Sequence, residues 1–315
     1  MIDHERIGES SMKRKIAAGS AVALVLIVIM AVQPLRSAAL GALSVFRVNQ
    51  VDTITVSVVD IEEMAQNLSA LQDIQEPDAP PVHIISQQKP AMQTLSSISD
   101  FTAFDVKLPA ALKDQTPDIA AVDSSTTVFS LIPDAANSWL ASLGSQYSLP
   151  DSIASAQYTL TTPPSLAVRY DAVTLIATQA PVLSSGDNSD VQTLWNTALT
   201  VPLIPDDVKS QLAAVNLSGG DVYLPVLDGL GRAANLNGTT GYLYTMSDLQ
   251  SLLGTLFQDG LALRSPMGTA LPGESDGMDE MQNASVLVWV QDGVLYALAG
   301  QVSDQELLSI AQSMK

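Results

Sequence analysis

The feature that most constrains this chain is an uncharged apolar segment close to its N-terminus. Residues 16–32 read IAAGSAVALVLIVIMAV, and Ser20 is their only polar side chain. Because a helix rises about 1.5 Å per residue, extension through Leu35 covers roughly 30 Å, the thickness of a bilayer's hydrocarbon core. Such a helix satisfies its own backbone hydrogen bonds in lipid. We therefore expect residues 16–35 to form a transmembrane helix that partners the lipid bilayer.

The charges that flank this segment predict its orientation. A Lys-Arg-Lys run occupies residues 13–15, whereas Arg36 and Arg47 are the only basic residues among the fifteen that follow Val32. Basic residues concentrate on the cytoplasmic side of a membrane helix. The sequence thus predicts a single-pass protein of the cell membrane, with residues 1–15 as a cytoplasmic N-terminal tail and the C-terminal domain extracytoplasmic.

A cleaved signal peptide is the alternative interpretation of the apolar segment. Signal peptides have an apolar core of about 7–15 residues followed by small residues at the cleavage site. Small residues do occur at 37–39 and 41, but the core is longer and residues 38–45 continue an apolar stretch. We favour an uncleaved signal anchor, and cleavage stays open. A buried core helix fits poorly, because it would not explain the basic flank or the all-round apolar surface.

Composition excludes several classes of function. The chain holds 33 acidic and 14 basic residues, a net charge of -19, no cysteine, and only His4 and His83 as histidines. Without cysteine there is no disulfide framework, thiolate zinc site or cysteine nucleophile. Two isolated histidines disfavour a Ser-His-Asp triad and a multi-histidine metal site. The acid excess disfavours nucleic acid as a partner.

The chain after the anchor divides into three parts. Residues 36–74 form a juxtamembrane strand and helix, with a strand over 48–59 and Asp60 as the N-cap of the helix. Residues 75–99 form a Pro-rich linker or arm that includes His83. Residues 100–315 form an acidic extracytoplasmic domain.

Alternating and helical apolar patterns make this outer domain α+β. Strands are expected at 101–109, 125–132, 157–162, 166–179 in two runs, 222–227, 286–290 and 294–299. Helices are expected at 134–144, 191–199, 206–215, 248–257 with Ser247 as cap, and after the capping box that runs from Ser303 to Glu306. Asp292-Gly293 is typical of a hairpin turn. Because strands and helices do not alternate regularly, we expect a mainly antiparallel sheet with helices packed on one face.

No motif identifies a chemical site. The GxGxxA match at 229–234 precedes a turn-rich run, so a glycine turn between strands is favoured over a dinucleotide site. Residues 187–190 and 274–280 are interpreted as exposed acidic loops, with calcium binding as the minor alternative, because neither matches a calcium-binding loop. The three tryptophans lie in apolar segments and are expected in the core: Trp139, Trp195 and Trp289. We predict no catalytic, cofactor-binding or metal-binding residue.

The C-terminal stretch VLVWVQDGVLYALAGQVSDQELLSIAQSMK resembles the end of a family of bacterial extracytoplasmic domains of unknown function. In that family a tryptophan-bearing strand, a hairpin, a glycine and a Ser-capped helix ending in Ser-x-Lys close the domain. The juxtamembrane run AALGALSVFRVNQVDTITV and the stretch FTAFDVKLPAAL, with its VxLP element at 106–109, are similar to corresponding family segments. The resemblance covers roughly residues 36–60 and 100–315.

Members of that family are often joined to anti-sigma factors with a cytoplasmic zinc-binding His/Cys domain. Residues 1–15 contain no cysteine and are too few to hold that domain. The resemblance therefore implies a membrane-tethered, sensory outer domain, without sigma-factor binding. It supplies no catalytic residue that maps onto this chain.

These observations favour a non-enzymatic protein of a bacterial envelope. Its outer domain is expected to bind or sense an unknown envelope protein or ligand. One alternative is a carrier or chaperone for a lipid or other hydrophobic ligand held between sheet and helices. A second, less favoured, alternative is an envelope hydrolase that acts through paired carboxylates.

Overall fold

A computed structural model describes residues 51–70, 81–142, 144–154, 156–202, 204–213, 222–245, 247–248 and 284–315. The expected transmembrane helix at 16–35, the acidic loop at 274–280 and nearly all of the expected helix at 248–257 lie outside these residues. Among the described helices, none combines the length and apolar character needed to span a bilayer.

The described chain is α+β, and its strands form three sheets. The two-stranded sheet pairs β1 (Val51–Ser57) with β10 (Val222–Asp228) in parallel, and all other pairings are antiparallel. The eight-stranded sheet has the order β11 (Arg232–Leu236), β12 (Thr239–Thr245), β13 (Ser285–Gln291), β14 (Val294–Gly300), β8 (Val173–Thr178), β7 (Ser165–Arg169), β4 (Asp118–Val122), β3 (Met92–Leu95). The four-stranded sheet has the order β2 (Val82–Gln88), β5 (Ser125–Leu131), β6 (Gln157–Thr162), β9 (Val182–Ser185). The mainly antiparallel α+β prediction is confirmed.

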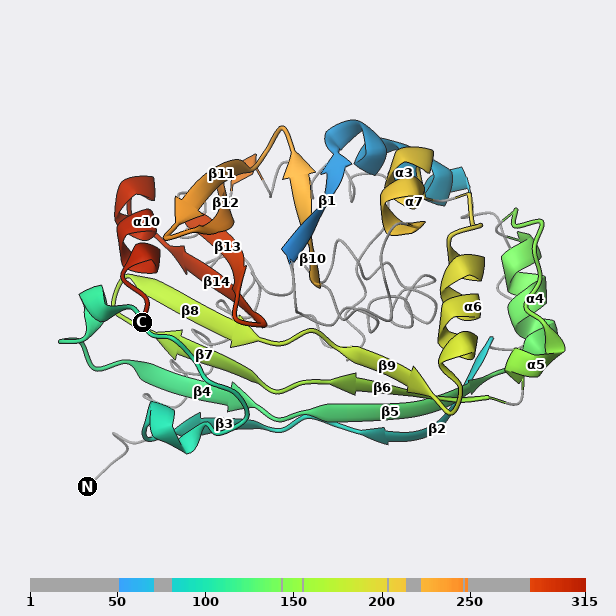
Figure 1. The fold of residues 1–315 in the computed structure, drawn as a ribbon, viewed down its shortest axis with the longest axis horizontal. Helices are drawn as coiled ribbons and strands as arrows, with labels where there is room; N and C mark the ends of the chain where they lie inside the picture. Colours follow the sequence, from blue (N-terminus) through green and yellow to red (C-terminus); the bar gives the residue numbers. More distant parts are fainter. Residues whose placement is uncertain are drawn as a thin grey trace, which may run out of the picture.

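In the described part of the chain, helices are fewer than strands. They are α3 (Val58–Ala70), α4 (Pro133–Ser142), α5 (Asp151–Ala154), α6 (Asn188–Ala198), α7 (Asp206–Ala213) and α10 (Asp304–Gln312), with the 3-10 turns η1 (Ile98–Asp100) and η2 (Ala110–Leu112). Figure 1 places α10 at one end of the molecule and α4, α5 and α6 at the other.

Four long strands connect the two larger sheets. The chain runs from β2 into β3, from β4 into β5, from β6 into β7 and from β8 into β9, and Figure 1 shows these ribbons side by side across the molecule. Three of the four joints contain proline, at residues 89–91, 163–164 and 179–181. Because proline has no amide hydrogen to donate, it interrupts the ladder where the strands pass from one sheet to the next.

The middle of the eight-stranded sheet is buried on both faces. On β13, Leu287 and Trp289 join the cluster that contains Leu307 of α10. The alternate residues Val286 and Val288 instead pack in the cluster that contains Ile61 of α3. The expectation of helices on one face is therefore wrong for this sheet: the continuous apolar run of β13 needs cover on both faces.

A separate core lies under the four-stranded sheet. Phe129, Leu131, Tyr158 and Leu183 are buried there beside residues of α4, α5 and α6. The rings of Phe129 and Tyr158 stack with their centroids 5.4 Å apart. Helices α4, α5 and α6 and the four-stranded sheet together enclose this second core.

The described part of the segment expected to be juxtamembrane, residues 51–70, is built into the body of the protein. β1 pairs along its whole length with β10, and Ile61 of α3 is 2% exposed. The helix starts one turn earlier than expected: the Ser57 amide donates to Asp60 Oδ2 at 2.7 Å, and the Asp60 amide donates to Ser57 Oγ at 3.0 Å. This reciprocal pair is a capping box, so Ser57 rather than Asp60 is the N-cap.

The outer edge of β1 is closed by a side chain. The Thr55 amide donates to Gln211 Oε1 at 2.7 Å, and Gln211 Nε2 donates to the Thr55 carbonyl at 2.9 Å. The glutamine amide of α7 thus occupies the place that a neighbouring strand would take.

Replacing Gln211 with alanine should loosen this edge. We expect Gln211→Ala to cost about 1 kcal/mol, since two partly solvated hydrogen bonds are lost, and to accelerate hydrogen exchange at the Thr55 amide. Gln192→Ala on α6 is the control, because Gln192 bonds only to the Asn196 side chain. Unchanged exchange at Thr55 would show that Gln211 does not hold the edge.

Several local expectations are now resolved. The segment 101–109 is irregular rather than a strand, and Phe104, Val106 and Leu108 pack from it against the core on the α10 side. The expected hairpin is confirmed by positive φ angles at Asp292 and Gly293. The expected Ser303 cap is confirmed by its bond from the Glu306 amide at 3.2 Å.

The Pro-rich stretch 75–99 is not a free linker, because it contains β2 and β3. It also contains an unpredicted capping box, in which the Ser97 amide donates to the Asp100 carboxylate at 3.0 Å.

Candidate functional site

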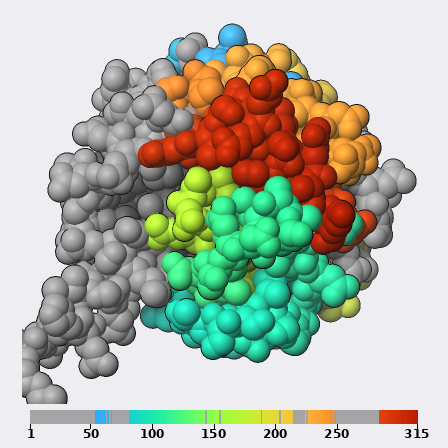
Figure 2. Space-filling model, turned by 90° about the vertical axis from the view of Figure 1, so that its left-hand side faces the viewer, coloured from blue at the N-terminus to red at the C-terminus, as the bar shows by residue number. Residues whose placement is uncertain are grey.

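The most distinctive surface is the outer edge formed by β2 and β3, here called the β2–β3 edge. In the described part of the chain, β2 is the last strand of its sheet beside β5, and β3 is the last strand of its sheet beside β4. Since β2 leads directly into β3, the two strands form one long border of the molecule (Figure 1). In Figure 2 the teal segment that contains β3 lies at the lower surface.

Large apolar side chains gather on this edge. Ile84, Ile85 and Met92 are 55%, 44% and 58% exposed. All six residues of β2 after Val82 are exposed, although Ile84 stands in register with the buried Phe129. Neither α4, α5 or α6 nor any other described element covers β2. Exposed apolar groups clustered on one strand are typical of an interaction surface.

The segment that carries β2 and β3 has no carboxylate of its own in a strongly acidic chain, although Asp123 accepts a hydrogen bond from Gln93 of β3. No Asp or Glu occurs between Asp78 and Asp100, whereas the whole chain carries -19. His83 and Lys89 are the ionisable side chains within this interval. Strand β2 therefore adds no negative charge of its own to an approaching partner.

The edge is limited in length. Pro81 precedes β2, and Lys89-Pro90 follows it. The register of β2 against β5 shifts between Ile84 and Ser86, which marks a β-bulge. Prolines, lysines and bulges are the devices by which proteins restrict pairing at sheet edges. The segment open to pairing is therefore short, and it is confined to β2.

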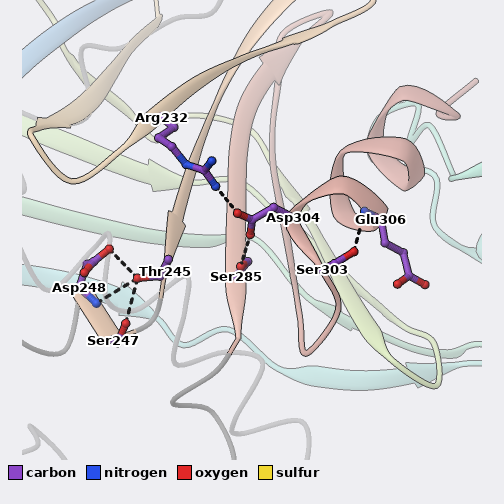
Figure 3. A network of polar contacts seen from close by, with 8 residues as sticks. All are labelled: Arg232, Thr245, Ser247, Asp248, Ser285, Ser303, Asp304 and Glu306. Carbon is purple, nitrogen blue, oxygen red and sulfur yellow. Dashed lines mark hydrogen bonds and ion pairs between the residues drawn. The ribbon is translucent and has the colours of Figure 1, made fainter.

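A second polar feature, drawn in Figure 3, joins the start of α10 to the sheet. Asp304 accepts a hydrogen bond from Ser285 Oγ at 2.7 Å and forms an ion pair with Arg232. Nearby, Thr245 Oγ1 donates to Asp248 Oδ2 at 2.6 Å and accepts from the Asp248 amide at 3.2 Å. Thr245, rather than the expected Ser247, is therefore the residue whose side chain accepts the Asp248 amide.

We assign this network a structural role. Both carboxylate oxygens of Asp304 are occupied by Ser285 and Arg232, so it holds α10 against β11 and β13. Within the described ranges, no three His, Cys, Asp or Glu side chains come together to hold a metal ion.

The motifs singled out in the sequence fall into structural positions. Gly229 has φ +82° in the turn between β10 and β11, so the GxGxxA match is a glycine turn between strands, as predicted. Trp195 and Trp289 are buried, and Trp139 packs partly buried against the core beneath the four-stranded sheet. His83 is exposed, as expected, but it lies on β2.

The acidic loop at 187–190 opens α6. The Asp187 carboxylate accepts the Ser189 amide at 2.8 Å and is the N-cap of this helix. That bond favours the charged form and lowers the pKa of Asp187.

This shift predicts a pH dependence at the start of α6. A lowered folded-state pKa stabilises the fold above the unfolded-state pKa, and the contribution is lost as pH falls through the folded value. We expect Asp187→Asn, which keeps the acceptor without the titration, to weaken the acid-induced loss of α6 protection in hydrogen exchange. Identical acid dependence in both proteins would contradict the role of the carboxylate.

Comparisons with known proteins identify no relative, so we interpret the site from its own geometry. No family model matches the chain, and neither a curated protein nor a solved structure matches it.

Sequence reasoning placed the β2–β3 edge in a linker. The signals that indicate it are Val82, Ile84 and Ile85 amid prolines, and the missing carboxylates.

Proposed function

We propose that this protein is a single-pass membrane protein whose extracytoplasmic domain binds an extended polypeptide strand at the β2–β3 edge. The apolar segment 16–35 and its basic flank support the anchor. The resemblance of the C-terminal stretch to bacterial extracytoplasmic domains supports an outer, non-enzymatic role. The observation that carries the binding function is the exposed, acid-free strand β2 at the border of a long sheet.

A free sheet edge offers both affinity and selectivity for a polypeptide. Its outward backbone amides and carbonyls can continue the ladder into an added strand, and side chains next to the edge select the sequence that pairs. β2 is held in register by β5, which is held in turn by β6. The edge is therefore preorganised, and little ordering of the domain opposes binding.

The carrier and hydrolase hypotheses have less structural support than strand binding. A hydrophobic carrier needs room between sheet and helix, but Leu307 of α10 contacts a cluster in which Leu287 and Leu298 are also fully buried. A carboxylate hydrolase needs available acids, but Asp304 is already paired with Arg232.

Site-specific photocrosslinking in intact cells tests the proposed function. A photoreactive amino acid at Gln87, an exposed position on β2, should give a discrete adduct of higher mass from the full chain. The same amino acid at Tyr147, which is 67% exposed but lies between α4 and α5, is the control. Adducts of equal yield at both positions, or none at Gln87, would overturn the proposal.

A further inference from the structure

We infer that the strand bound at the β2–β3 edge belongs to a basic partner: an extended segment with apolar side chains on one face and a lysine or arginine at each end. This inference rests on the proposed strand-binding function and names the chemical class of its partner. It follows from which side chains β2 exposes and from where acidic side chains flank it.

The register of β2 against β5 determines which face of an added strand must be apolar. Val82 pairs with Leu131, and Ile84 pairs with Phe129. Leu131 and Phe129 are buried in the core beneath the four-stranded sheet. Because directly paired residues lie on the same face of a sheet, Ile84 is on the face of this core, yet it is 55% exposed. Apolar side chains on the same face of an added strand would cover it.

The β-bulge places a second apolar side chain beside the first. Ile84 pairs with Phe129 and Ser86 pairs with Val128, so Ile85 is the extra residue between two neighbouring positions of β5. Ile85 is 44% exposed. A bulge interrupts the regular alternation of side chains and turns one of them in a new direction. The apolar contact that β2 offers is therefore concentrated at its middle, and the polar residues 86–88 follow.

Acidic side chains flank β2 at both ends. The Ile132 amide donates to the Pro81 carbonyl at 3.0 Å, and Asp134 follows two residues later in the first turn of α4. Beyond the other end of β2, the Asp123 amide donates to the Ala91 carbonyl at 2.9 Å. Asp134 and Asp123 are both exposed. Each carboxylate is thus fixed within a few residues of one end of the strand.

These flanking carboxylates and the net charge of -19 favour a basic partner. A lysine or arginine at each end of the added strand would meet opposite charge. A second copy of this chain would instead bring another -19 to the contact. Lys89 lies at the Asp123 end of β2, where its charge partly offsets that carboxylate. We therefore expect Asp134 to contribute more than Asp123 to the attraction.

Synthetic peptides that bind the full chain in a non-ionic detergent test the chemistry of the partner. The lysine peptide has about nine residues, alternates threonine and valine, and carries a lysine at each end, so that it spans β2 with one residue to spare on either side. A glutamate peptide and a glutamine peptide differ from it only at the two ends. In fluorescence anisotropy, the lysine peptide should bind at least about tenfold more tightly than the glutamate peptide. Added salt should reduce this difference.

Variants without a single charge locate the attraction on the protein. Asp134→Asn and Asp123→Asn should weaken binding of the lysine peptide by about threefold and leave the glutamine peptide unaffected, since one exposed ion pair is lost. Lys89→Gln should instead strengthen binding of the lysine peptide. Asp207→Asn on α7, the helix beside β1, removes the same charge and is the control, with no change expected for either peptide. Equal effects of Asp134→Asn and Asp207→Asn would overturn the inference.

A fourth peptide separates the partner's chemistry from strand binding itself. The lysine peptide with proline in place of its central valine cannot complete a ladder, so we expect it to lose at least about tenfold in affinity. If the glutamate peptide binds as tightly as the lysine peptide while the proline peptide does not, the basic partner is wrong and strand binding stands. No binding of any peptide would overturn the inference too, and the photoadduct at Gln87 would then decide on strand binding alone. A concentration-dependent dimer in sedimentation that no peptide dissociates would assign the edge to a second copy and also overturn the inference.

Discussion

Gly300→Ala is expected to destabilise the folded domain by roughly 3 kcal/mol, because the new methyl group has no space. A Cβ at this position would lie 2.5 Å from the carbonyl oxygen of Ala172 and 2.6 Å from Cγ1 of Val173. Gly300 is the last residue of β14, where it pairs with Val173 on one side and Ser285 on the other. The clash with backbone cannot be relieved by a rotamer change, so the strands must separate locally. Urea denaturation followed by tryptophan fluorescence measures the loss.

Gly186→Ala is the matched control for this substitution. Gly186 directly follows β9 of the four-stranded sheet, and a Cβ there meets no atom within 4 Å. We expect this variant to unfold at nearly the parent's urea concentration. An equal loss of stability in both variants would contradict the close approach of β14 to β8.

Ile61→Ala tests whether the juxtamembrane segment belongs to the core. Ile61 is 2% exposed and packs with Leu224, Leu227 and Val286. Removing its side chain from a packed cluster should cost about 3 kcal/mol, through lost burial and the cavity left behind. Val59→Ala on the same helix should cost almost nothing, because Val59 is 70% exposed. Equal stability of the two variants in urea denaturation would mean that α3 is not packed against the domain.

The position of Ile61 has a functional consequence. β1 begins at Val51, close in sequence to the expected membrane segment at 16–35, and it pairs directly with β10 in the body of the protein. The domain is therefore joined to its proposed anchor through a core strand rather than through the Pro-rich stretch.

Sequence patterns predict well the elements whose start or turn is determined by particular residue types close together in the chain. Asp292-Gly293 supplies the two positive φ angles that a tight hairpin needs, and Ser303 with Glu306 marks the start of α10. The apolar runs on either side of Tyr170-Asp171 also form β7 and β8 as expected. In each case a few neighbouring residues determine the backbone conformation.

Elements that depend on distant partners are predicted poorly. The parallel pairing of Val51 with Val222 joins segments far apart in the sequence, and nothing local indicates it. Residues 101–109 alternate like a strand, yet Lys107 instead donates its amide to the hydroxyl of Tyr296 at 3.1 Å, and the segment lies across the sheet as an irregular loop. Tertiary packing overrides the local pattern in both cases.

The candidate site was missed for a related reason. β2 is exposed on both faces, so it shows no alternation of buried and exposed residues, and its prolines are typical of a linker. Its strand conformation is imposed by β5, against which it lies. Only the apolar Ile84-Ile85 pair amid polar residues and the absence of acids indicate this edge from sequence.

Membrane topology tests the central claim most directly. A reporter whose activity depends on its compartment, fused through a flexible linker after Lys315, measures on which side of the membrane the domain lies. The account predicts that the intact fusion sediments with membranes and that the reporter is active only outside the cytoplasm. A fusion that remains in the soluble cytosolic fraction, or a reporter active in the cytoplasm, would contradict it.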